Sequence, residues 1–295
     1  MDKKYLTPSE ISESFIEIGK TKANLAYYKV LTLSILAGAF IAFAAQGSNT
    51  AIHGITNIGL QKTLAGVLFA TGLMLVVIAG AELFTGNTLI VISCLQGKTP
   101  WRKMFENWAL VYGGNFVGSM IIVFLISLSG QLNYSNGLLG AFTLKVASGK
   151  VGLTFLQAFC LGILCNWLVC LAVWMSTAAK DIVSKIFAIF FPILLFITSG
   201  FEHSVANMYY IPAGILAKSN PVYVQQAIEQ YGVSAANIEN LNWINMVFNN
   251  LVPVTLGNIV GGAFFVGIFY SIGYLFNRSR KGTTSDTIVN TMTSK

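Results

Sequence analysis

The chain has 295 residues, of which 55% are hydrophobic and only 10% are charged, and its mean hydropathy is +0.68. This composition is typical of a membrane protein with several spans and excludes a water-soluble globular domain. The formal net charge of +7 would suit a nucleic-acid-binding protein, but the basic residues follow the loops between apolar segments, so we expect no nucleic-acid partner.

The N-terminal segment, residues 1–28, is polar and precedes every apolar run, unlike a cleaved signal peptide. Within it, residues 8–20 are predicted to form a short helix, because Thr7 can cap it and Ile11 and Phe15 lie on one face. We expect this segment to be cytoplasmic and its helix to lie on the membrane surface or at a subunit contact. A gating role is the open alternative.

Six apolar stretches follow, which we interpret as membrane spans, since crossing the ~30 Å hydrocarbon core of a bilayer takes ~20 apolar residues. They cover residues 30–46, 64–95, 106–130, 153–178, 186–216 and 247–276. The second and the fifth are too long for one plain helix, which would run over about 45 Å at 1.5 Å per residue. We therefore expect each of them to be two half-helices joined by a break near the middle of the membrane. Such a break is tolerated only where protein or a water-filled cavity satisfies the exposed backbone.

The two overlong stretches carry the same signature, Gly-x-Glu-x-x-x-x-Asn, at 80–87 and 200–207. A second motif, Gly-Asn-x-Val-Gly, occurs at 114–118 and recurs at 257–261. With three spans in each half, the two halves have opposite orientations in the membrane. The sequence thus predicts an all-α membrane protein with an inverted 3+3 repeat, and a functional site where the halves meet. The transmembrane domain is expected at 29–276, with its repeats at about 29–130 and 153–276.

Charge sets the expected orientation. Six spans put both termini on one side, and fourteen Lys and Arg residues fall on that side. Four fall on the other: Lys62, Lys145, Lys150 and Lys218. By the positive-inside rule, both termini are expected in the cytoplasm, with the protein in the inner (plasma) membrane. Residues 277–295 are expected to form a flexible cytoplasmic tail, and the loop at 217–246 to cover the outer face.

Two carboxylates and one histidine are the ionisable residues deep within the spans. A charge at membrane depth costs roughly 2.5–3.5 kcal/mol on insertion scales, so Glu82 and Glu202 require a reason. We expect a structural role, in which each carboxylate accepts hydrogen bonds from backbone N–H groups at the start of a half-helix. Asn87 and Asn207 are expected to share that role. Direct contact of Glu202 with the substrate is the open alternative.

His203 has no counterpart in the first repeat, where Leu83 stands. With an unperturbed pKa near ~6.5, a histidine can offer a hydrogen bond or a proton at cellular pH. The hydroxyl of Thr85, in the first break, could meet His203 or a small anion, and the starts of the half-helices suit an anion. A core packing role for His203 is the alternative.

Large apolar residues precede both breaks: Phe69 and Leu73 the first, Phe196 the second. They either pack helices together or form two constrictions, one on each side of His203, that stop hydrated ions.

Three polar residues could shape the approach to this site. Lys150 lies just outside the fourth span and could attract anions at the outer mouth, or it could be a solvated lysine. Asn166 and Asn258 lie inside apolar spans, and each could line the path or bond across helices.

Several motifs together resemble one family. They are Gly-Ala-Glu-Leu-Phe-Thr at 80–85, Asn-Trp at 107–108, Tyr-Gly-Gly-Asn at 112–115, Gly-Ile-Leu-Cys-Asn-Trp at 162–167, Gly-Phe-Glu-His-Ser-Val-Ala-Asn-Met at 200–208 and Pro-Val-Thr-Leu-Gly-Asn at 253–258. They resemble the formate–nitrite transporter family, and most closely its formate channel branch. The resemblance runs from about Ser9 to Phe276.

This resemblance implies an aquaporin-like bundle that assembles as a homopentamer, with one pore in each protomer. It implies that His203 is the central proton donor or hydrogen-bond partner and that Thr85 faces it. It implies roles for six other residues: Phe69 and Leu73 at the inner constriction, Phe196 at the outer one, and Lys150 and Asn166 at the outer approach with Asn258 nearby.

The expected function is a channel or transporter for small monovalent weak-acid anions, with formate first. An anion drawn to a positive vestibule would meet an apolar constriction and cross as the neutral acid. The proton would come through His203, or His203 would stay neutral and only bond the anion. Permeation would then depend on pH and be linked to protons.

Other substrates and classes stay open. Nitrite, hydrosulfide and lactate transport use the same skeleton, a proton symporter is close in kind, and a neutral-solute pore is a different class. An enzyme is least supported, because no nucleophile–base pair or metal set is present, and no cofactor is expected.

Overall fold

The computed structural model describes residues 5–276, and helices make up nearly all of this part of the chain. Six helices within it are long and apolar enough to span a membrane. They are α2 (Tyr27–Ile52), α3 (Ile58–Ala79), α6 (Trp101–Leu128), α8 (Phe155–Ala178), α9 (Ile182–Ser199) and the continuous run Trp243–Tyr274. The predicted all-α fold with six spans is confirmed.

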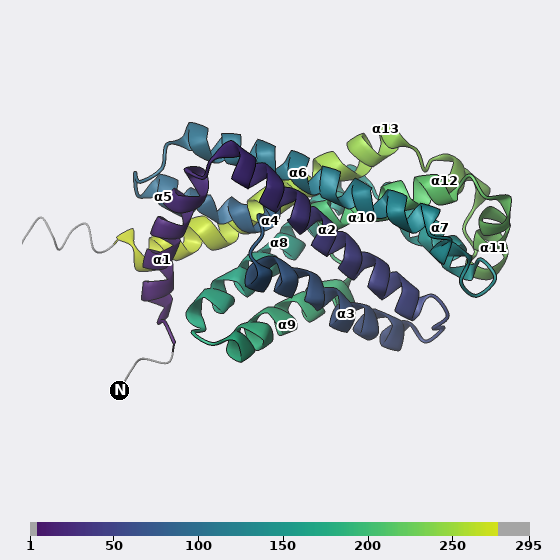
Figure 1. The fold of residues 1–295 in the computed structure, drawn as a ribbon, viewed down its shortest axis with the longest axis horizontal. Helices are drawn as coiled ribbons and strands as arrows, with labels where there is room; N and C mark the ends of the chain where they lie inside the picture. Colours follow the sequence, from purple (N-terminus) through teal and green to yellow (C-terminus); the bar gives the residue numbers. More distant parts are fainter. Residues whose placement is uncertain (1–4, 277–295) are drawn as a thin grey trace, which may run out of the picture.

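Shorter helices complete the bundle. They are α1 (Pro8–Ala23), α4 (Phe84–Asn87), η1 (Thr88–Ile90), α5 (Val91–Leu95), η2 (Gln131–Asn133), α7 (Leu138–Val151), α10 (Ser204–Ala217), α11 (Pro221–Tyr231) and α12 (Ala235–Glu239). Figure 1 shows α1 at one end of the bundle and α11 and α12 at the other. The end of α15 (Phe269–Tyr274), the last described helix, lies at the same end as α1, in yellow in Figure 1.

The last span is built from several helical pieces: α13 (Trp243–Asn245), η3 (Met246–Leu251), α14 (Val252–Ile259), η4 (Val260–Ile268) and α15 (Phe269–Tyr274). Both η3 and η4 are π-helical, a wider winding that is frequent near functional sites. Gly262 in η4 lies so close to Thr88 that a β-carbon would collide with the threonine hydroxyl. The wide turn therefore brings this span directly against the segment after the first break.

Both overlong stretches are broken, as predicted. The helix α3 ends at Ala79, Gly80 takes φ +85°, and α4 begins at Phe84. The helix α9 ends at Ser199, and Gly200 takes φ +74° before α10. Glycine accepts these left-handed conformations without the steric cost that a β-carbon brings. This explains why each signature begins with glycine.

The helix α7 is the main departure from the predicted spans, because it forms between the third and fourth of them, in the segment that holds Lys145 and Lys150. Fourteen residues are too few to cross a bilayer, so a search for spans misses this helix. It packs against α10 and α11 instead. Lys62 also differs from its expected loop position, since it lies on α3.

The helix α1 was predicted at 8–20, and the structure places it at Pro8–Ala23. The backbone N–H of Thr7 donates to the carboxylate of Glu10 (2.8 Å), which fixes the start of the helix. Phe15 stacks on Trp174 with ring centroids 4.9 Å apart. The helix therefore packs on its own protomer, across one end of the bundle and against α5.

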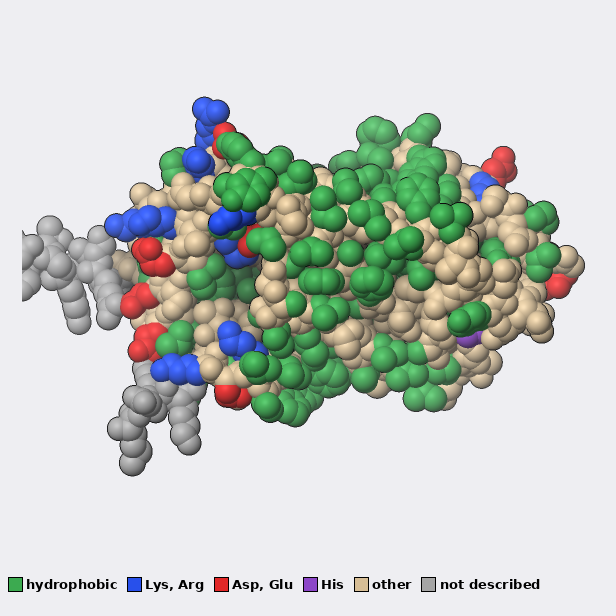
Figure 2. Space-filling model, viewed as in Figure 1, with side chains coloured by type: hydrophobic (Ala, Val, Ile, Leu, Met, Phe, Trp, Pro, Cys, Tyr) green, Lys and Arg blue, Asp and Glu red, His purple; other side chains and the backbone are tan. Residues whose placement is uncertain are grey.

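Polar and apolar side chains divide along the long axis. Figure 2 shows charged side chains gathered toward the two ends and a wide apolar zone between them. This distribution matches a bilayer crossed along that axis. The expected tail at 277–295 lies outside the described residues.

Replacing Gly80 with alanine tests whether the first break depends on the glycine conformation. No atom lies within 4 Å of the added β-carbon, so only backbone strain acts, at about 1–2 kcal/mol. We expect the apparent melting temperature of purified G80A in detergent to fall by roughly 2–6 °C. Gly54 is the control, because its β-carbon also meets nothing within 4 Å and its φ is not positive. Equal melting temperatures for G80A and G54A would contradict this account.

Candidate functional site

Each break is joined to a neighbouring span through its backbone. The N–H of Glu82 donates to the carbonyl of Leu33 in α2 (3.2 Å), and the N–H of Glu202 donates to the carbonyl of Leu161 in α8 (3.2 Å). An unpaired N–H at this depth would cost several kcal/mol. The two bonds have equivalent places in the two repeats, so they fix both breaks in the same way.

An asparagine braces the first break from α6. The N–H of Phe84, at the start of α4, donates to Asn115 Oδ1 (3.0 Å). The Nδ2 of Asn115 donates to the carbonyls of Ser34 (2.7 Å) and Glu82 (3.0 Å). One buried amide thus satisfies groups of the break and of α2, and ties three elements together.

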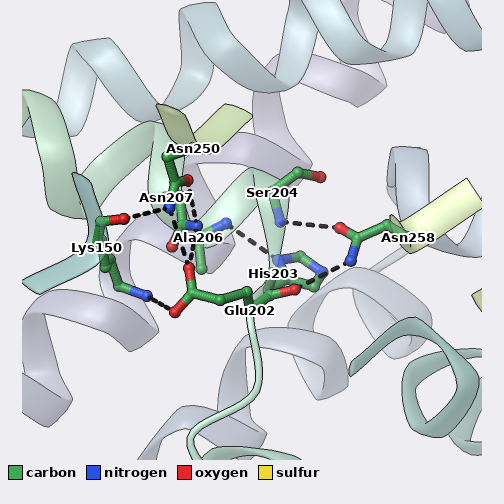
Figure 3. Close-up of polar contacts among 8 residues, drawn as sticks. All are labelled: Lys150, Glu202, His203, Ser204, Ala206, Asn207, Asn250 and Asn258. Atoms are coloured by element: carbon green, nitrogen blue, oxygen red, sulfur yellow. Dashed lines mark hydrogen bonds and ion pairs between the residues drawn. The ribbon is translucent and has the colours of Figure 1, made fainter. Parts of the chain in front are cut away.

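Asn258 braces the second break in the same manner. The N–H of Ser204 donates to Asn258 Oδ1 (2.9 Å), as Figure 3 shows. The Nδ2 of Asn258 donates to the carbonyls of Gly162 (2.8 Å) and Glu202 (3.0 Å). Of the two roles considered for Asn258, this is bonding across helices, since both of its N–H groups are committed to backbone carbonyls.

The carboxylate of Glu82 is held by side chains. Lys22 Nζ, at the end of α1, donates to Glu82 Oε1 (2.6 Å). Asn87 Nδ2 donates to Glu82 Oε2 (2.7 Å) and to Asn107 Oδ1 (2.8 Å). The lysine side chain is 28% exposed and the carboxylate side chain only 8%. A buried negative charge is therefore neutralised by a lysine that still reaches solvent.

Glu202 has a matching set of partners, drawn in Figure 3. Lys150 Nζ donates to Glu202 Oε1 (2.9 Å), and Asn207 Nδ2 donates to Glu202 Oε2 (2.6 Å) and to Asn250 Oδ1 (2.7 Å). Asn250 Nδ2 in turn donates to the backbone carbonyl of Lys150 (2.9 Å). The two clusters thus repeat the same chemistry: lysine, glutamate and two asparagines.

These donors differ from those expected from sequence. Backbone N–H groups of the half-helices were expected to hold the carboxylates, but Asn115 and Asn258 take the first of those groups. The carboxylates instead point sideways to lysines on α1 and α7. Lys150 is accordingly not a free cation, since its side chain is only 15% exposed and its ammonium also lies 5.2 Å from the Tyr210 ring centroid.

The His203 ring joins the two breaks. Its Nδ1 accepts the N–H of Ala206 (3.0 Å), and its Nε2 lies 3.0 Å from Thr85 Oγ1. Because Nδ1 accepts a hydrogen bond, the neutral ring carries its proton on Nε2. Nε2–H then donates to the threonine hydroxyl. An imidazolium would point a second N–H at Ala206, so this geometry favours the neutral ring.

Three groups saturate the carbonyl oxygen of Thr85. Thr88 Oγ1 (2.7 Å), Asn166 Nδ2 (3.2 Å) and Cys170 Sγ (3.3 Å) all donate to it. Asn166 Nδ2 also lies 2.6 Å from the carbonyl oxygen of Asn258. Asn166 therefore bonds across helices and holds the backbone carbonyl of Thr85.

The aromatic residues predicted at the two constrictions lie in contact with each other. The ring of Phe69 meets that of Phe196 edge to face, with centroids 5.8 Å apart, and their assignment to constrictions stays a prediction. Phe196 in turn lies against the His203 ring at 6.1 Å. Leu73 is four residues after Phe69 in α3, about 6 Å along the helix axis, so the two residues lie at different levels. All three apolar side chains are at most 3% exposed.

A cavity of about 350 Å³ opens at the α1 end of the bundle. Its walls include Lys22 and Glu82, and its apolar lining includes Leu73, Leu83 and Leu89. Neither Phe69 nor Phe196 lines it. The cavity is thus a vestibule that reaches the first break and Leu73, short of the two phenylalanines.

Four site residues were missed in the sequence analysis: Lys22, Asn107, Asn115 and Asn250. The repeat offsets carried a signal for them. Asn107 and Asn250 are separated by 143 residues, as are Asn115 and Asn258. Lys22 lies on α1, which precedes the predicted repeat at 29–130, so the repeat carried no signal for its role at the break.

Comparison with known proteins finds similar proteins over most of the chain. The formate/nitrite transporter family model matches residues 9–272. The formate channel FocA of Escherichia coli is 40% identical, covering 92% of this chain and 95% of that protein. The Haemophilus influenzae formate channel FocA is 42% identical, covering 90% and 93%. A solved pentameric formate channel with formate bound has a TM-score of 0.74 and 40% identity, covering 85% of this chain and 98% of the other.

Removing Lys150 tests whether it compensates the Glu202 charge. K150M leaves a buried carboxylate without a cation, so we expect a loss of about 2–4 kcal/mol in stability, measured by thermal unfolding in detergent. The double variant K150M/E202Q removes both charges and should recover most of that loss.

Lys20 provides the matched control, because its 3.9 Å pair with Glu17 is exposed on both sides. K20M should lie within about 0.5 kcal/mol of the wild type. If K150M and K150M/E202Q were equally unstable, the ion pair would not be the source of the loss.

Proposed function

The chain belongs to the formate/nitrite transporter family, and we propose that it carries formate across a membrane as a homopentamer of separate pores. It is a membrane protein with six spans, and the relatives described above are channels rather than enzymes. Formate is the substrate named for both FocA relatives, and the solved relative is a pentamer with formate bound. Identity near 40% over nine-tenths of the chain supports the transfer of this substrate.

The protein would lie in the inner (plasma) membrane with both termini in the cytoplasm. The excess of basic residues in the terminal segments and in the loops on the same side supports this orientation. The vestibule under α1 would then open to the cytoplasm. An exposed apolar stripe on α9, which includes Val183, Phe187 and Phe191, would face lipid or a neighbouring protomer.

The buried Thr85–His203 pair carries the mechanism. It lies next to Phe196, beyond a vestibule whose lining includes Leu73. A carboxylate that leaves water for apolar surroundings loses far more solvation energy than the neutral acid does. We therefore infer that formate crosses this point with a proton, so that each transport event moves no net charge. Accumulation would then follow a pH gradient, as in proton symport.

His203 would act as a hydrogen-bond donor in this step. Its Nδ1 is committed to the Ala206 N–H, so a proton passed from the ring would have to come from Nε2, which would leave an anionic ring. Of the two routes considered from sequence, the neutral ring that bonds the substrate fits this geometry better. The proton would reach formate from solvent in the vestibule, whose lining includes Lys22.

Nitrite, hydrosulfide and lactate are the other substrates of this skeleton that the sequence left open. A neutral-solute pore is the alternative from another class. The two classes differ in how flux depends on pH. Permeation of a weak acid accelerates on acidification, whereas flux of a neutral solute does not.

Radiolabelled formate uptake into proteoliposomes, measured across external pH, tests the proposal. Uptake by the wild type should rise as the external pH falls, and should exceed equilibration when the inside is more alkaline. A wild type that passes no formate would refute formate transport, and the same assay with nitrite and hydrosulfide would then rank the other substrates. Formate flux with no pH dependence would refute proton linkage.

Substitutions at position 203 test the role of the ring. H203N keeps a cap acceptor and an N–H donor but cannot be protonated, so we expect pH-dependent uptake to persist. H203F removes the donor and should lower uptake by roughly 10-fold, the scale of one hydrogen bond lost at a buried site. Melting temperature and elution volume serve as folding controls. Loss of pH dependence in H203N would assign proton transfer to His203.

A further inference from the structure

Two lysines approach the breaks without an acidic partner. Among residues 5–276, the ion pairs formed by basic side chains belong to Lys20, Lys22, Arg102 and Lys150. Lys185 and Lys62 make no ion pair or side-chain hydrogen bond within this part of the chain. Their charges are therefore available, unlike those of Lys22 and Lys150, which the two glutamates neutralise.

Lys185 lines the vestibule. It is the fourth residue of α9, is partly buried, and shares the cavity wall with Gly80 and Ala81 of the first break. Figure 2 shows a hollow at this end of the molecule with basic side chains at its rim. The nearby Asp181 is engaged in capping the helix, where it accepts the N–H of Ser184 (2.8 Å). Lys185 thus borders a cavity of about 350 Å³, which has room for a small anion.

Lys62 has a similar position at the second break. It is the fifth residue of α3 and is exposed, and its Nζ lies 2.8 Å from the point where a β-carbon of Gly200 would stand. Gly200 is the left-handed residue that opens the second break. Each break is therefore approached by one lysine that is paired with its glutamate and by one that is not.

The two unpaired lysines match in the repeat. Lys62 lies near the start of α3 and Lys185 near the start of α9, the longer helix before each break. The helices α3 and α9 pack against each other. This packing puts the start of each helix beside the break at the end of the other. Neither helix has an acidic residue in its first turn, although the positive end of a helix dipole disfavours lysine there. Asn57 and Asp181 already cap the two helix starts, through the N–H groups of Leu60 and Ser184. Helix stability does not account for a lysine at these two places, whereas the ammonium of each could attract a small anion.

We propose that Lys185 and Lys62 are the anion-loading sites of the two mouths, each binding one small monovalent carboxylate before it reaches the apolar constriction. This inference rests on the proposed function, because it presumes that the transported species arrives as an anion. Lys22 and Lys150 keep the breaks neutral, and Lys185 and Lys62 supply the uncompensated positive charge. Loading on the α1 side depends on Lys185, and loading on the opposite side depends on Lys62.

Side-specific uptake kinetics test this assignment. Initial rates of radiolabelled formate uptake are measured at low ionic strength in intact cells and in inverted membrane vesicles, which present opposite mouths. We expect K185Q to raise the apparent KM roughly 3- to 10-fold for uptake through the α1-side mouth only, and K62Q to do so for the opposite mouth only. K185R and K62R should stay near the wild type. The effect should vanish at about 1 M salt, where the screening length is ~3 Å.

Matched charge removals separate a site from a general field. K180Q removes an exposed lysine five residues before Lys185, and K145Q removes a lysine whose ammonium lies over the Phe142 and Tyr231 rings. Neither should change the apparent KM. Equal shifts in the controls, equal shifts from both sides, or no shift in K185Q and K62Q would each overturn the assignment. If the wild type carried no formate at all, the proposed function would fail instead. Failure of the proposed function is thereby distinguished from failure of the lysine assignment.

Discussion

The structure depends on one constraint: no backbone polar group can be left unpaired at membrane depth. Two spans are interrupted there, and each interruption exposes N–H and C=O groups that a continuous helix would pair internally. The bundle supplies the partners from the other two spans of the same repeat. The first span offers a backbone carbonyl, at Leu33 or Leu161, and the third offers a buried asparagine, at Asn115 or Asn258. Breaking a helix thus locks three helices together at one point.

Charge follows the same logic. The carboxylate at each break accepts hydrogen bonds from a lysine and an asparagine, but it also brings a negative charge that needs compensation. The compensating lysines come from α1 and α7, two helices that do not span the membrane. Each repeat is therefore larger than its three spans, because it begins with a short helix that ends in a lysine. The helix α1 therefore supports the first break, because it carries the lysine that pairs with Glu82.

The two repeats differ where transport requires a difference. Leu83 and His203 have equivalent places, directly before a half-helix, but only the histidine can cap that helix with a side chain. Capping fixes the ring, and the fixed ring points Nε2 at Thr85 of the other repeat. One departure from symmetry thus creates a polar pair where the halves meet. Phe196 of α9 then packs against the His203 ring, and Phe69 of α3 packs edge to face on Phe196.

Much of this could be predicted from the sequence, because it depends on local properties. Hydropathy and length predicted the six spans, and the excess length of two of them predicted the breaks at Gly80 and Gly200. The paired motifs predicted the repeat, and the lone histidine predicted the asymmetry. The motifs also carried the family resemblance, which the comparisons confirmed.

The rest was decided only by the tertiary structure. Three features depend on how the inverted halves interleave. They are the donors that hold Glu82 and Glu202, the bonds of Asn166 and Asn258 across helices, and the contact of Phe69 with Phe196. Lys22 lies 60 residues from its glutamate along the chain, and α7 has no length or pattern that marks it as part of a repeat. A sequence determines which segments enter the membrane, since that free energy belongs to each segment alone. The partners of a buried polar group follow from packing, since they come from helices far apart in the chain.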